Sequence, residues 1–222
     1  NLSKIIGNSV QALNFTYPLD ASSPRTVQIR ITGTRTTLKR TITKRTKALL
    51  FSSPENPTGH IYAADEIVPA MRMLGAQGIW TIIDRVNNQL HYNEKKSGDF
   101  RSSVIEHCIY VNSFSKNYFL PGLRIGWITA TPTIVERVSK TLGAERICVS
   151  RLTQEVAYDF LCRLPGNQVA NRYLAILAKH RLIMCQVLQQ EGFSVSMPDG
   201  GTNFFLSVGA PSEFFAKRLF EQ

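Results

Sequence analysis

Residues 113–127 read Ser-Phe-Ser-Lys-Asn-Tyr-Phe-Leu-Pro-Gly-Leu-Arg-Ile-Gly-Trp and contain the most informative lysine of the 222-residue chain. This lysine, Lys116, lies between an apolar segment at residues 108–111 and a turn rich in small residues. Such a position can hold an amine in its deprotonated form, which is the form that makes a Schiff base with an aldehyde. The stretch therefore indicates Lys116 as a candidate catalytic residue.

Two further segments predict strands that lead into polar residues. Residues 49–59 run from an apolar strand into a turn at Asn56, and residues 78–84 form a second apolar strand that ends on Asp84. The intervals from Asn56 to Asp84 (84−56 = 28) and from Asp84 to Lys116 (116−84 = 32) each fit a strand–crossover–strand unit of about 30 residues. Such units place three polar groups at the carboxyl edge of parallel strands, where open α/β sheets bind their ligands.

In this order and spacing, the segments resemble the lysine motif and cofactor-binding strands of the fold-type I pyridoxal-phosphate enzymes, in particular the class I and II aminotransferases. The resemblance extends over residues 43–208. It implies an α/β fold in which a mainly parallel sheet is flanked by helices, followed by part of a small α+β domain. It also implies the cofactor pyridoxal 5'-phosphate.

The resemblance assigns roles to individual residues. Lys116 would form the internal aldimine with the cofactor and then act as the base at the substrate Cα. Asp84 would pair with the pyridinium nitrogen and raise its pKa, and Asn56 would donate to the phenolic oxygen. The phosphate would be held by three residues of the lysine motif: Ser113, Ser115 and Arg124.

One departure from the family concerns the residue that contacts the phenolic oxygen. The segment after Asp84 reads Arg-Val-Asn, and Asn87 stands where the family usually has a tyrosine. The Asn87 amide can still donate a hydrogen bond, but it is shorter. We therefore expect an altered imine pKa. Elimination, oxidation or cyclisation of an amino acid remains an alternative to transamination.

A second departure lies at the amino end. Residues 7–13 resemble the glycine-rich turn and helix start that bind the phosphate in the family, so Gly7, Asn8 and Ser9 are predicted cofactor ligands. Only four positions (17−13 = 4) separate this segment from Tyr17, which resembles a later tyrosine of the family. A helix and a strand do not fit there. Either the sequence joins segments that are apart in the whole protein, or the protein has lost part of the region that surrounds the cofactor. An ordinary helix start is the alternative interpretation of residues 7–13.

Hydrophobic periodicity predicts the organisation of the rest of the chain. Helices are predicted at residues 60–78, 133–142, 153–164, 167–191 and 212–220, and strands at 124–130, 193–196 and 202–208. The change from βα units to a long helix with a hairpin predicts two domains. Residues 1–164 would form the large cofactor-binding domain, incomplete in its amino-terminal part. Residues 165–222 would form a connecting helix and part of a small domain.

The net charge of +10 is concentrated in one segment. Eight basic residues and no acidic one lie between residues 25 and 47. Val27, Ile29 and Ile31 alternate with polar residues as in a half-buried strand, so the charges are expected to face solvent. The segment lacks the interleaved aromatics of a single-strand binder, which makes nucleic acid an unlikely partner. For this segment, a basic patch with a binding role is the alternative to a solvated surface. For the function of the chain, the alternatives to an enzyme are a non-enzymatic sensor domain of an aminotransferase-like regulator and a cofactor-free paralogue.

The remaining composition predicts a soluble, cytoplasmic protein that has no membrane contact. No apolar run reaches the roughly 18 to 20 residues that cross a bilayer, and no charged-then-apolar leader opens the chain. The cysteines lack metal-type spacing and are predicted to be reduced and buried: Cys108, Cys148, Cys162 and Cys185. The leading hypothesis is a homodimeric aminotransferase whose substrates are an amino acid and a keto acid, with the dimer implied by the resemblance.

Overall fold

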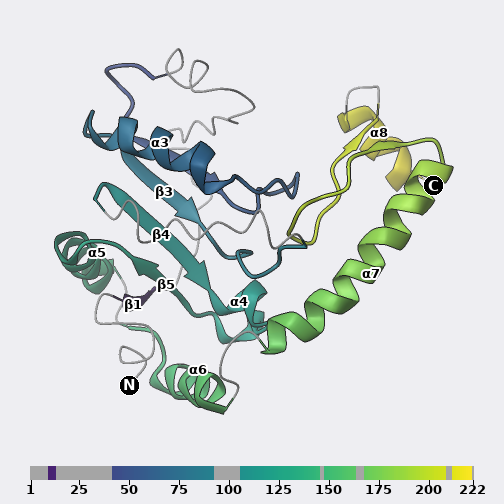
Figure 1. The fold of residues 1–222 in the computed structure, drawn as a ribbon. Helices are drawn as coiled ribbons and strands as arrows, with labels where there is room; N and C mark the ends of the chain where they lie inside the picture. The colour runs from purple at the N-terminus through teal and green to yellow at the C-terminus, as the bar shows by residue number, and fades with distance from the viewer. Residues whose placement is uncertain are drawn as a thin grey trace.

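The computed structural model describes residues 10–13, 42–92, 106–145, 148–163, 168–208 and 212–221, which form a helix-flanked sheet followed by a long helix and a small hairpin (Figure 1). The strands are β1 (Val10–Leu13), β2 (Ala48–Ser52), β3 (Trp80–Asp84), β4 (Cys108–Ser113), β5 (Gly126–Thr129), β6 (Ser194–Val195) and β7 (Leu206–Ser207). The helices are α3 (Ala64–Gly75), α4 (Phe114–Asn117), the 3-10 helix η2 (Pro121–Leu123), α5 (Pro132–Glu145), α6 (Arg151–Arg163), α7 (Gln168–Gln190) and α8 (Ser212–Phe220). The predicted α/β class is confirmed, and each element predicted between residues 49 and 220 is present with somewhat different ends.

The main sheet has the strand order β1-β5-β4-β3-β2. Three neighbouring strands at one end of this order, β4, β3 and β2, are parallel, and the register pairs Ser52 with Asp84 and Asp84 with Val111. β5 runs antiparallel to β4, and β1 runs antiparallel to β5. The predicted parallel strands are therefore present, and their carboxyl ends meet at one edge of the sheet.

The amino-terminal segment differs from the prediction. Residues 7–13 were expected to start a helix, whereas Val10–Leu13 forms the edge strand β1 and pairs with β5 from Val10↔Thr129 to Leu13↔Gly126. A segment of this length gains little from helical hydrogen bonds in isolation, while pairing with β5 satisfies its backbone directly. Gly7, Asn8 and Ser9 lie outside the described residues, as does most of the basic segment.

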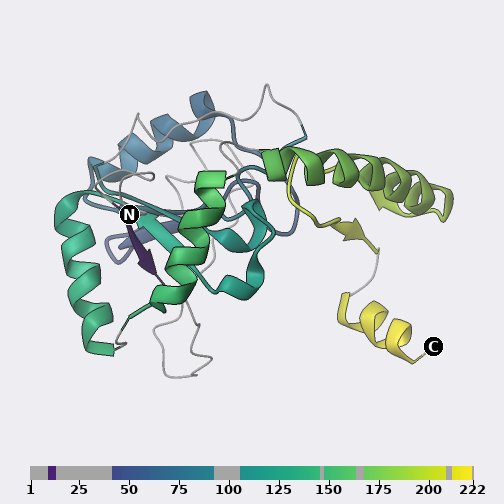
Figure 2. The same ribbon diagram turned by 90° about the horizontal axis from the view of Figure 1, so that it is seen from below.

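Two apolar clusters pack on the sheet. The first joins α3 to the parallel strands, and Leu74 of α3 and Ile83 of β3 are completely buried in it. The second gathers α6 around the lysine motif, where Phe114, Ile125 and Ala157 are buried. Figure 2 shows α3 and α6 at separate places along the sheet. The segment that carries Lys116 is therefore part of the core and not a surface turn.

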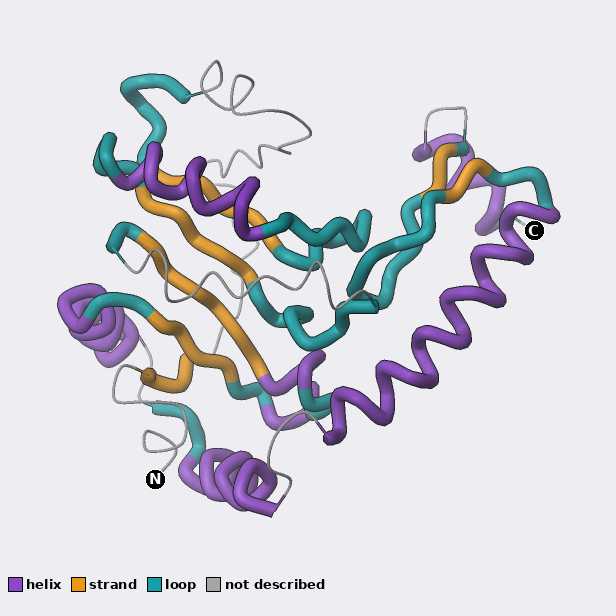
Figure 3. The backbone as a smooth tube through the Cα atoms, viewed as in Figure 1, coloured by secondary structure: helices purple, strands orange, loops and turns teal. Residues whose placement is uncertain are grey.

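Helix α7 leads from the region of α4 towards α8, and the chain between β6 and β7 returns to the loops that follow β2 and β3 (Figure 3). Backbone hydrogen bonds close this junction: Gly200 N donates to Gly59 O at 2.9 Å, and Gly201 N donates to Leu90 O at 2.7 Å. The backbones approach so closely that a Cβ added to Gly59, which has φ +71, would lie 2.4 Å from Pro198 Cβ. Three loops from distant parts of the sequence are thereby locked together.

The cysteines are partly as predicted. Cys108 and Cys185 are buried, and burial raises the pKa of the Cys108 thiol to about 11. Cys148 and Cys162 are exposed, which corrects the expectation that all four are buried. Among the described helices, none combines the length and the apolar character that crossing a membrane requires.

The close packing of the three loops can be tested at Gly200. A Cβ there would lie 2.5 Å from Pro54 Cγ and 2.6 Å from Leu90 O. We expect Gly200→Ala to lower the free energy of unfolding by about 1–3 kcal/mol, because the loops must separate to admit the methyl group. Gly143→Ala is the control, because nothing lies within 4 Å of its Cβ position in α5. This change should raise stability by up to about 1 kcal/mol through helix propensity. Urea titration compares the two, and equal stabilities would contradict the packing argument.

Candidate active site

The sheet edge brings together most of the predicted site residues that fall within the described chain. Asp84 is the last residue of β3, and Ser113 is the last residue of β4. Lys116 lies in α4, directly after β4, and Asn56 lies in the turn that follows β2. Because β2, β3 and β4 are adjacent and parallel, these residues lie at the same edge of the sheet, where the strands end. Among the described residues, no group of three or more His, Cys, Asp or Glu side chains gathers as metal ligands would.

The short helix α4 separates its buried and exposed side chains clearly. Ser113 caps the helix, because its Oγ accepts a hydrogen bond from Ser115 N at 3.2 Å. Phe114 and Asn117, three positions apart, are completely buried, whereas Lys116 is exposed. The Phe114 ring packs against Trp127 with centroids 5.5 Å apart. The helix is thus held from its inward side while it presents the Lys116 amine outward.

Asp84 occupies a position that is unfavourable for a charged carboxylate. Burial raises its pKa above the usual carboxyl value, and the hydrogen bond from Val86 N to Asp84 Oδ1 at 2.9 Å lowers it but does not offset the burial. A strand-end carboxylate with a raised pKa is typical of residues retained for binding or catalysis. A cation beside Asp84 would remove the cost of its charge.

Asn87 lies in the turn after Asp84, and one of its side-chain atoms lacks a hydrogen-bond partner. Its side-chain oxygen Oδ1 is buried and has no hydrogen-bond partner among the described residues. Buried polar atoms in folded proteins usually have partners, so an unpaired one calls for an explanation. A ligand that supplies the missing partner is one such explanation.

Asn56 is held at both its backbone and its side chain. Asn56 N donates to Ser52 Oγ at 3.1 Å, and Asn56 Oδ1 accepts from Asn203 Nδ2 at 2.9 Å. Because the amide oxygen of Asn56 is engaged by Asn203, its amide nitrogen is left to donate elsewhere. This contact joins residues 147 positions apart in the sequence, and no pattern in the residues adjacent to either of them indicates it.

The predicted phosphate ligands are less clearly assembled. Arg124 has a left-handed backbone with φ 52, is exposed, and donates from Nη1 to Pro121 O at 3.0 Å. Ser113 Oγ accepts the Ser115 amide, so its own hydroxyl hydrogen remains available. The structure describes no contact between Arg124 and these serines, and their joint role stays a prediction.

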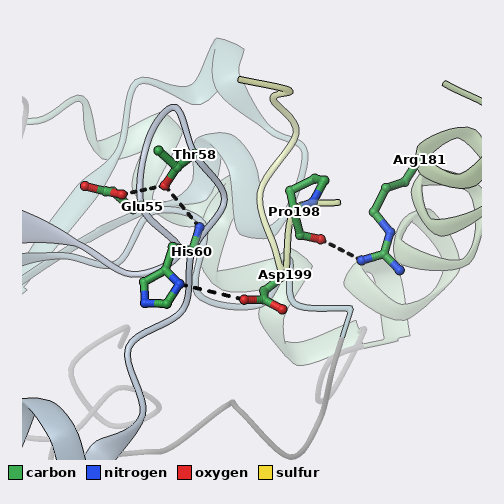
Figure 4. A network of polar contacts seen from close by, with 6 residues as sticks. All are labelled: Glu55, Thr58, His60, Arg181, Pro198 and Asp199. Carbon is green, nitrogen blue, oxygen red and sulfur yellow. Dashed lines mark hydrogen bonds and ion pairs between the residues drawn. The ribbon is translucent and has the colours of Figure 1, made fainter. Parts of the chain in front are cut away.

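The loop that carries Asn203 is fastened to the large sheet beside Asn56. Arg181 of α7 donates from Nη1 to Pro198 O at 2.6 Å (Figure 4). Its guanidinium also lies over the Tyr92 ring, 4.2 Å from the ring centroid. The Tyr92 hydroxyl donates to Gly201 O at 2.8 Å, and burial raises the pKa of Tyr92 against the opposing effect of Arg181.

A second set of contacts joins this loop to the turn of Asn56. His60 Nδ1 is 3.9 Å from Asp199 Oδ2, and the Thr58 hydroxyl donates to the Glu55 carboxylate within the turn (Figure 4). Residues 198–203 therefore form one wall of the candidate site next to the Asn56 turn.

Comparison with known proteins gives a consistent result. The family model described as aminotransferase class I and II matches residues 12–222. The 3-methylarginine biosynthesis aminotransferase ArgM of Streptomyces arginensis is 35% identical over 168 residues, which cover 73% of this chain and 43% of ArgM. The aspartate aminotransferase of Thermotoga maritima is 27% identical over 180 residues, covering 80% of this chain and 46% of that enzyme.

Solved structures agree with the sequence matches. The crystal structure of an aminotransferase from Mycobacterium tuberculosis superposes with a TM-score of 0.77 at 25% identity, covering 86% of this chain and 50% of that protein. The crystal structure of MJ0684 from Methanococcus jannaschii superposes with a TM-score of 0.73 at 25% identity, covering 85% and 50%. The chain thus spans about half the length of the relatives it matches.

Because Asp84 is buried, replacing it with a neutral residue is predicted to raise the stability of the folded protein by an amount that depends on pH. Because the folded-state pKa is raised, the folded protein binds a proton more tightly than the unfolded chain, and stability falls as pH rises from the unfolded pKa of about 3.9 through the raised value. Asp84→Asn keeps an acceptor for Val86 N and removes the charge. In protein freed of small-molecule ligands, we expect this variant to melt a few degrees higher than wild type at pH 7.5.

The gain should shrink as pH falls through the raised folded-state pKa, because folded wild-type Asp84 then takes up a proton, and it should be smallest at and below the unfolded pKa of about 3.9. Thermal melts followed by circular dichroism at several pH values measure it. A gain that is equal at pH 7.5 and at about pH 4 would contradict a raised carboxyl pKa.

Proposed function

The chain belongs to the class I and II aminotransferase family, and on that basis we propose that the whole protein transfers an amino group between an amino acid and a keto acid with pyridoxal 5'-phosphate as cofactor. The observation that carries the proposal is the meeting of Asn56, Asp84 and Lys116 at one edge of three parallel strands. Ligands of open α/β sheets bind at this edge.

The residues at the edge fit the chemistry of that cofactor. A protonated pyridine nitrogen beside Asp84 would offset the cost of burying the carboxylate, which otherwise raises its pKa. The phenolic oxygen needs hydrogen-bond donors, and the amide nitrogen of Asn56 is left available by the Asn203 contact. Asn87 lies in the same turn as Val86, the hydrogen-bond donor to Asp84; its unpaired Oδ1 is an acceptor, so only its amide nitrogen could donate to the phenolic oxygen.

Each residue would contribute a separate function. When bound, pyridoxal phosphate supplies an aldehyde that condenses with amines and a ring that withdraws electrons from the substrate Cα. Lys116 would hold the cofactor through its Nζ and, once released, accept and return the proton of the substrate Cα at that atom. Asp84 would keep the ring nitrogen protonated. The phosphate would be bound by Ser113, Ser115 and Arg124, to which Gly7, Asn8 and Ser9 would add backbone and hydroxyl donors.

We also propose the context in which this activity operates. Named relatives include an enzyme of 3-methylarginine biosynthesis and several aspartate aminotransferases, so amino acids with polar side chains are the substrate class we favour. We propose a cytoplasmic homodimer. A division near residue 165 would separate the cofactor-binding domain from α7 and the small domain.

The role of Lys116 predicts a spectroscopic result. Purified protein supplied with pyridoxal phosphate should show an absorbance band near the visible edge that borohydride abolishes. Lys116→Ala should lose this band and at least about a thousandfold in transamination rate, because both the attachment point and the proton-transfer group are removed. Lys140→Ala is the matched control, since Lys140 is an exposed lysine of α5 that pairs with Glu136 at 2.7 Å. A band that persists unchanged in Lys116→Ala would contradict the assignment.

The departure at Asn87 predicts a shift in the pH dependence of that band. In Asn87→Tyr, a phenol hydroxyl would donate to the cofactor's phenolic oxygen more directly than the shorter amide. A stronger donor favours the anionic form of that oxygen, so the pH midpoint of the absorbance change should fall. Asn87→Phe has the same bulk without the donor and should not show this decrease. Titration of absorbance against pH compares the three proteins, and an identical midpoint in wild type and Asn87→Tyr would remove the argument.

A further inference from the structure

We propose that Asn117 is a positioning residue, whose buried side-chain amide fixes the turn after Asp84 against the helix that carries Lys116. The inference rests on the proposed function, because it concerns how two residues that would hold the cofactor are kept at a set separation. Asn117 directly follows Lys116, and it is completely buried whereas Lys116 is exposed. The sequence gives it no motif, so its role is visible only from its contacts.

Two backbone groups determine the orientation of the Asn117 amide. Gln89 N donates to Asn117 Oδ1 at 3.1 Å, and Asn117 Nδ2 donates to Arg85 O at 3.3 Å. Because one partner is a donor and the other is an acceptor, the amide fits in one orientation. The two groups lie at the ends of the turn that begins directly after Asp84, and Asn88 N donates to Arg85 O at 3.0 Å within it. Asn117 therefore spans the whole turn that contains Asn87.

The same amide also reaches the end of β4. Asn117 Nδ2 lies 2.7 Å from Asn112 Oδ1, and Asn112 Oδ1 in turn accepts from Ser113 N at 2.8 Å. The side chain of Asn88 lies 2.7 Å from Asn117 Nδ2 and belongs to the same cluster. One buried side chain thus connects three pieces of the site: the turn after β3, the carboxyl end of β4 and helix α4.

The separation between these pieces matters because the cofactor ring is rigid. Its aldehyde and its ring nitrogen lie on opposite sides of the ring, so one ring can reach both Lys116 and Asp84 only at a matching separation. Asp84 is fixed by the sheet, whereas Lys116 lies on a helix of four residues, too short to be stable by its own hydrogen bonds. Tertiary contacts must therefore hold α4 in place, and among its four residues the buried ones are Phe114 and Asn117.

The hydrogen bonds of Asn117 restrict the orientation of α4 more than the ring packing of Phe114 does. Phe114 packs α4 onto the second apolar cluster, but ring packing tolerates small rotations and shifts. The Asn117 amide contacts defined backbone atoms of the Asp84 turn, and hydrogen bonds to fixed backbone groups are directional. Removing the amide would deprive the partly buried Gln89 N of its acceptor and Arg85 O of one of its donors. The turn and α4 would then rearrange relative to each other.

The test compares Asn117→Ala with wild type and with Leu74→Ala. Leu74 of α3 is completely buried in the first apolar cluster, so its truncation destabilises the protein away from α4. We expect Asn117→Ala to lower the affinity for pyridoxal phosphate by about tenfold to a hundredfold, in line with loss of a buried hydrogen-bond partner. We expect kcat to fall by up to about a hundredfold, with a smaller change in KM, because misplacement affects the reacting geometry most. The pH midpoint of the bound cofactor's absorbance should move as well.

Leu74→Ala should melt at a lower temperature than wild type but keep the wild-type affinity and pH midpoint. If Asn117→Ala behaves like Leu74→Ala in these readouts, Asn117 is merely structural and the inference is overturned. Asn117→Ser keeps a hydroxyl that can donate and accept, and it replaces the alanine variant if that variant fails to fold. Wild-type protein that binds no pyridoxal phosphate would instead overturn the proposed function, and this inference with it.

Discussion

The parallel register of β2, β3 and β4 is the constraint on which the candidate site depends. It aligns Ser52 with Asp84 and Asp84 with Val111, so three chain segments leave the sheet at the same edge. Backbone bonds extend the alignment past the strands, since Ser53 N donates to Asp84 O and Arg85 N donates to Val111 O. Polar groups from distant positions are gathered by the backbone, with no requirement that their side chains bind one another.

The two apolar clusters offset the free-energy cost of this polar edge. Leu74 and Ile83 support β3 from the side of α3, while Phe114 supports α4 from the side of α6. The edge itself contains groups that oppose folding, a carboxylate with a raised pKa at Asp84 and an unpaired polar atom at Asn87. Proteins retain such costs where binding or catalysis requires them, and the surrounding core must offset them.

The sequence was sufficient for the parts of the fold whose signals are local. Apolar runs that end on Asp84 or lead to Lys116 predicted the strands, and their spacing predicted the parallel edge. Residues 7–13 were interpreted as a helix start because they resemble the glycine-rich turn of the family. The conformation of Val10–Leu13 is instead set by pairing with β5. The Asn56–Asn203 contact and the inward amide of Asn117 are tertiary features. Neither leaves a pattern in adjacent residues, so only the folded chain reveals them.

The locked loops also determine where the chain after residue 203 can move. Gly59 and Gly200 allow backbones to approach without intervening side chains, and Gly201 N and Tyr92 N add hydrogen bonds to the same junction. The wall formed by residues 198–203 is thereby attached to the loops of the main sheet, although β6 and α7 precede it in the chain. Any movement of α8 relative to the sheet would leave this wall in place as long as these hydrogen bonds hold. Such a movement would be taken up in β7 and the residues after it, while Asn203 keeps its place beside Asn56.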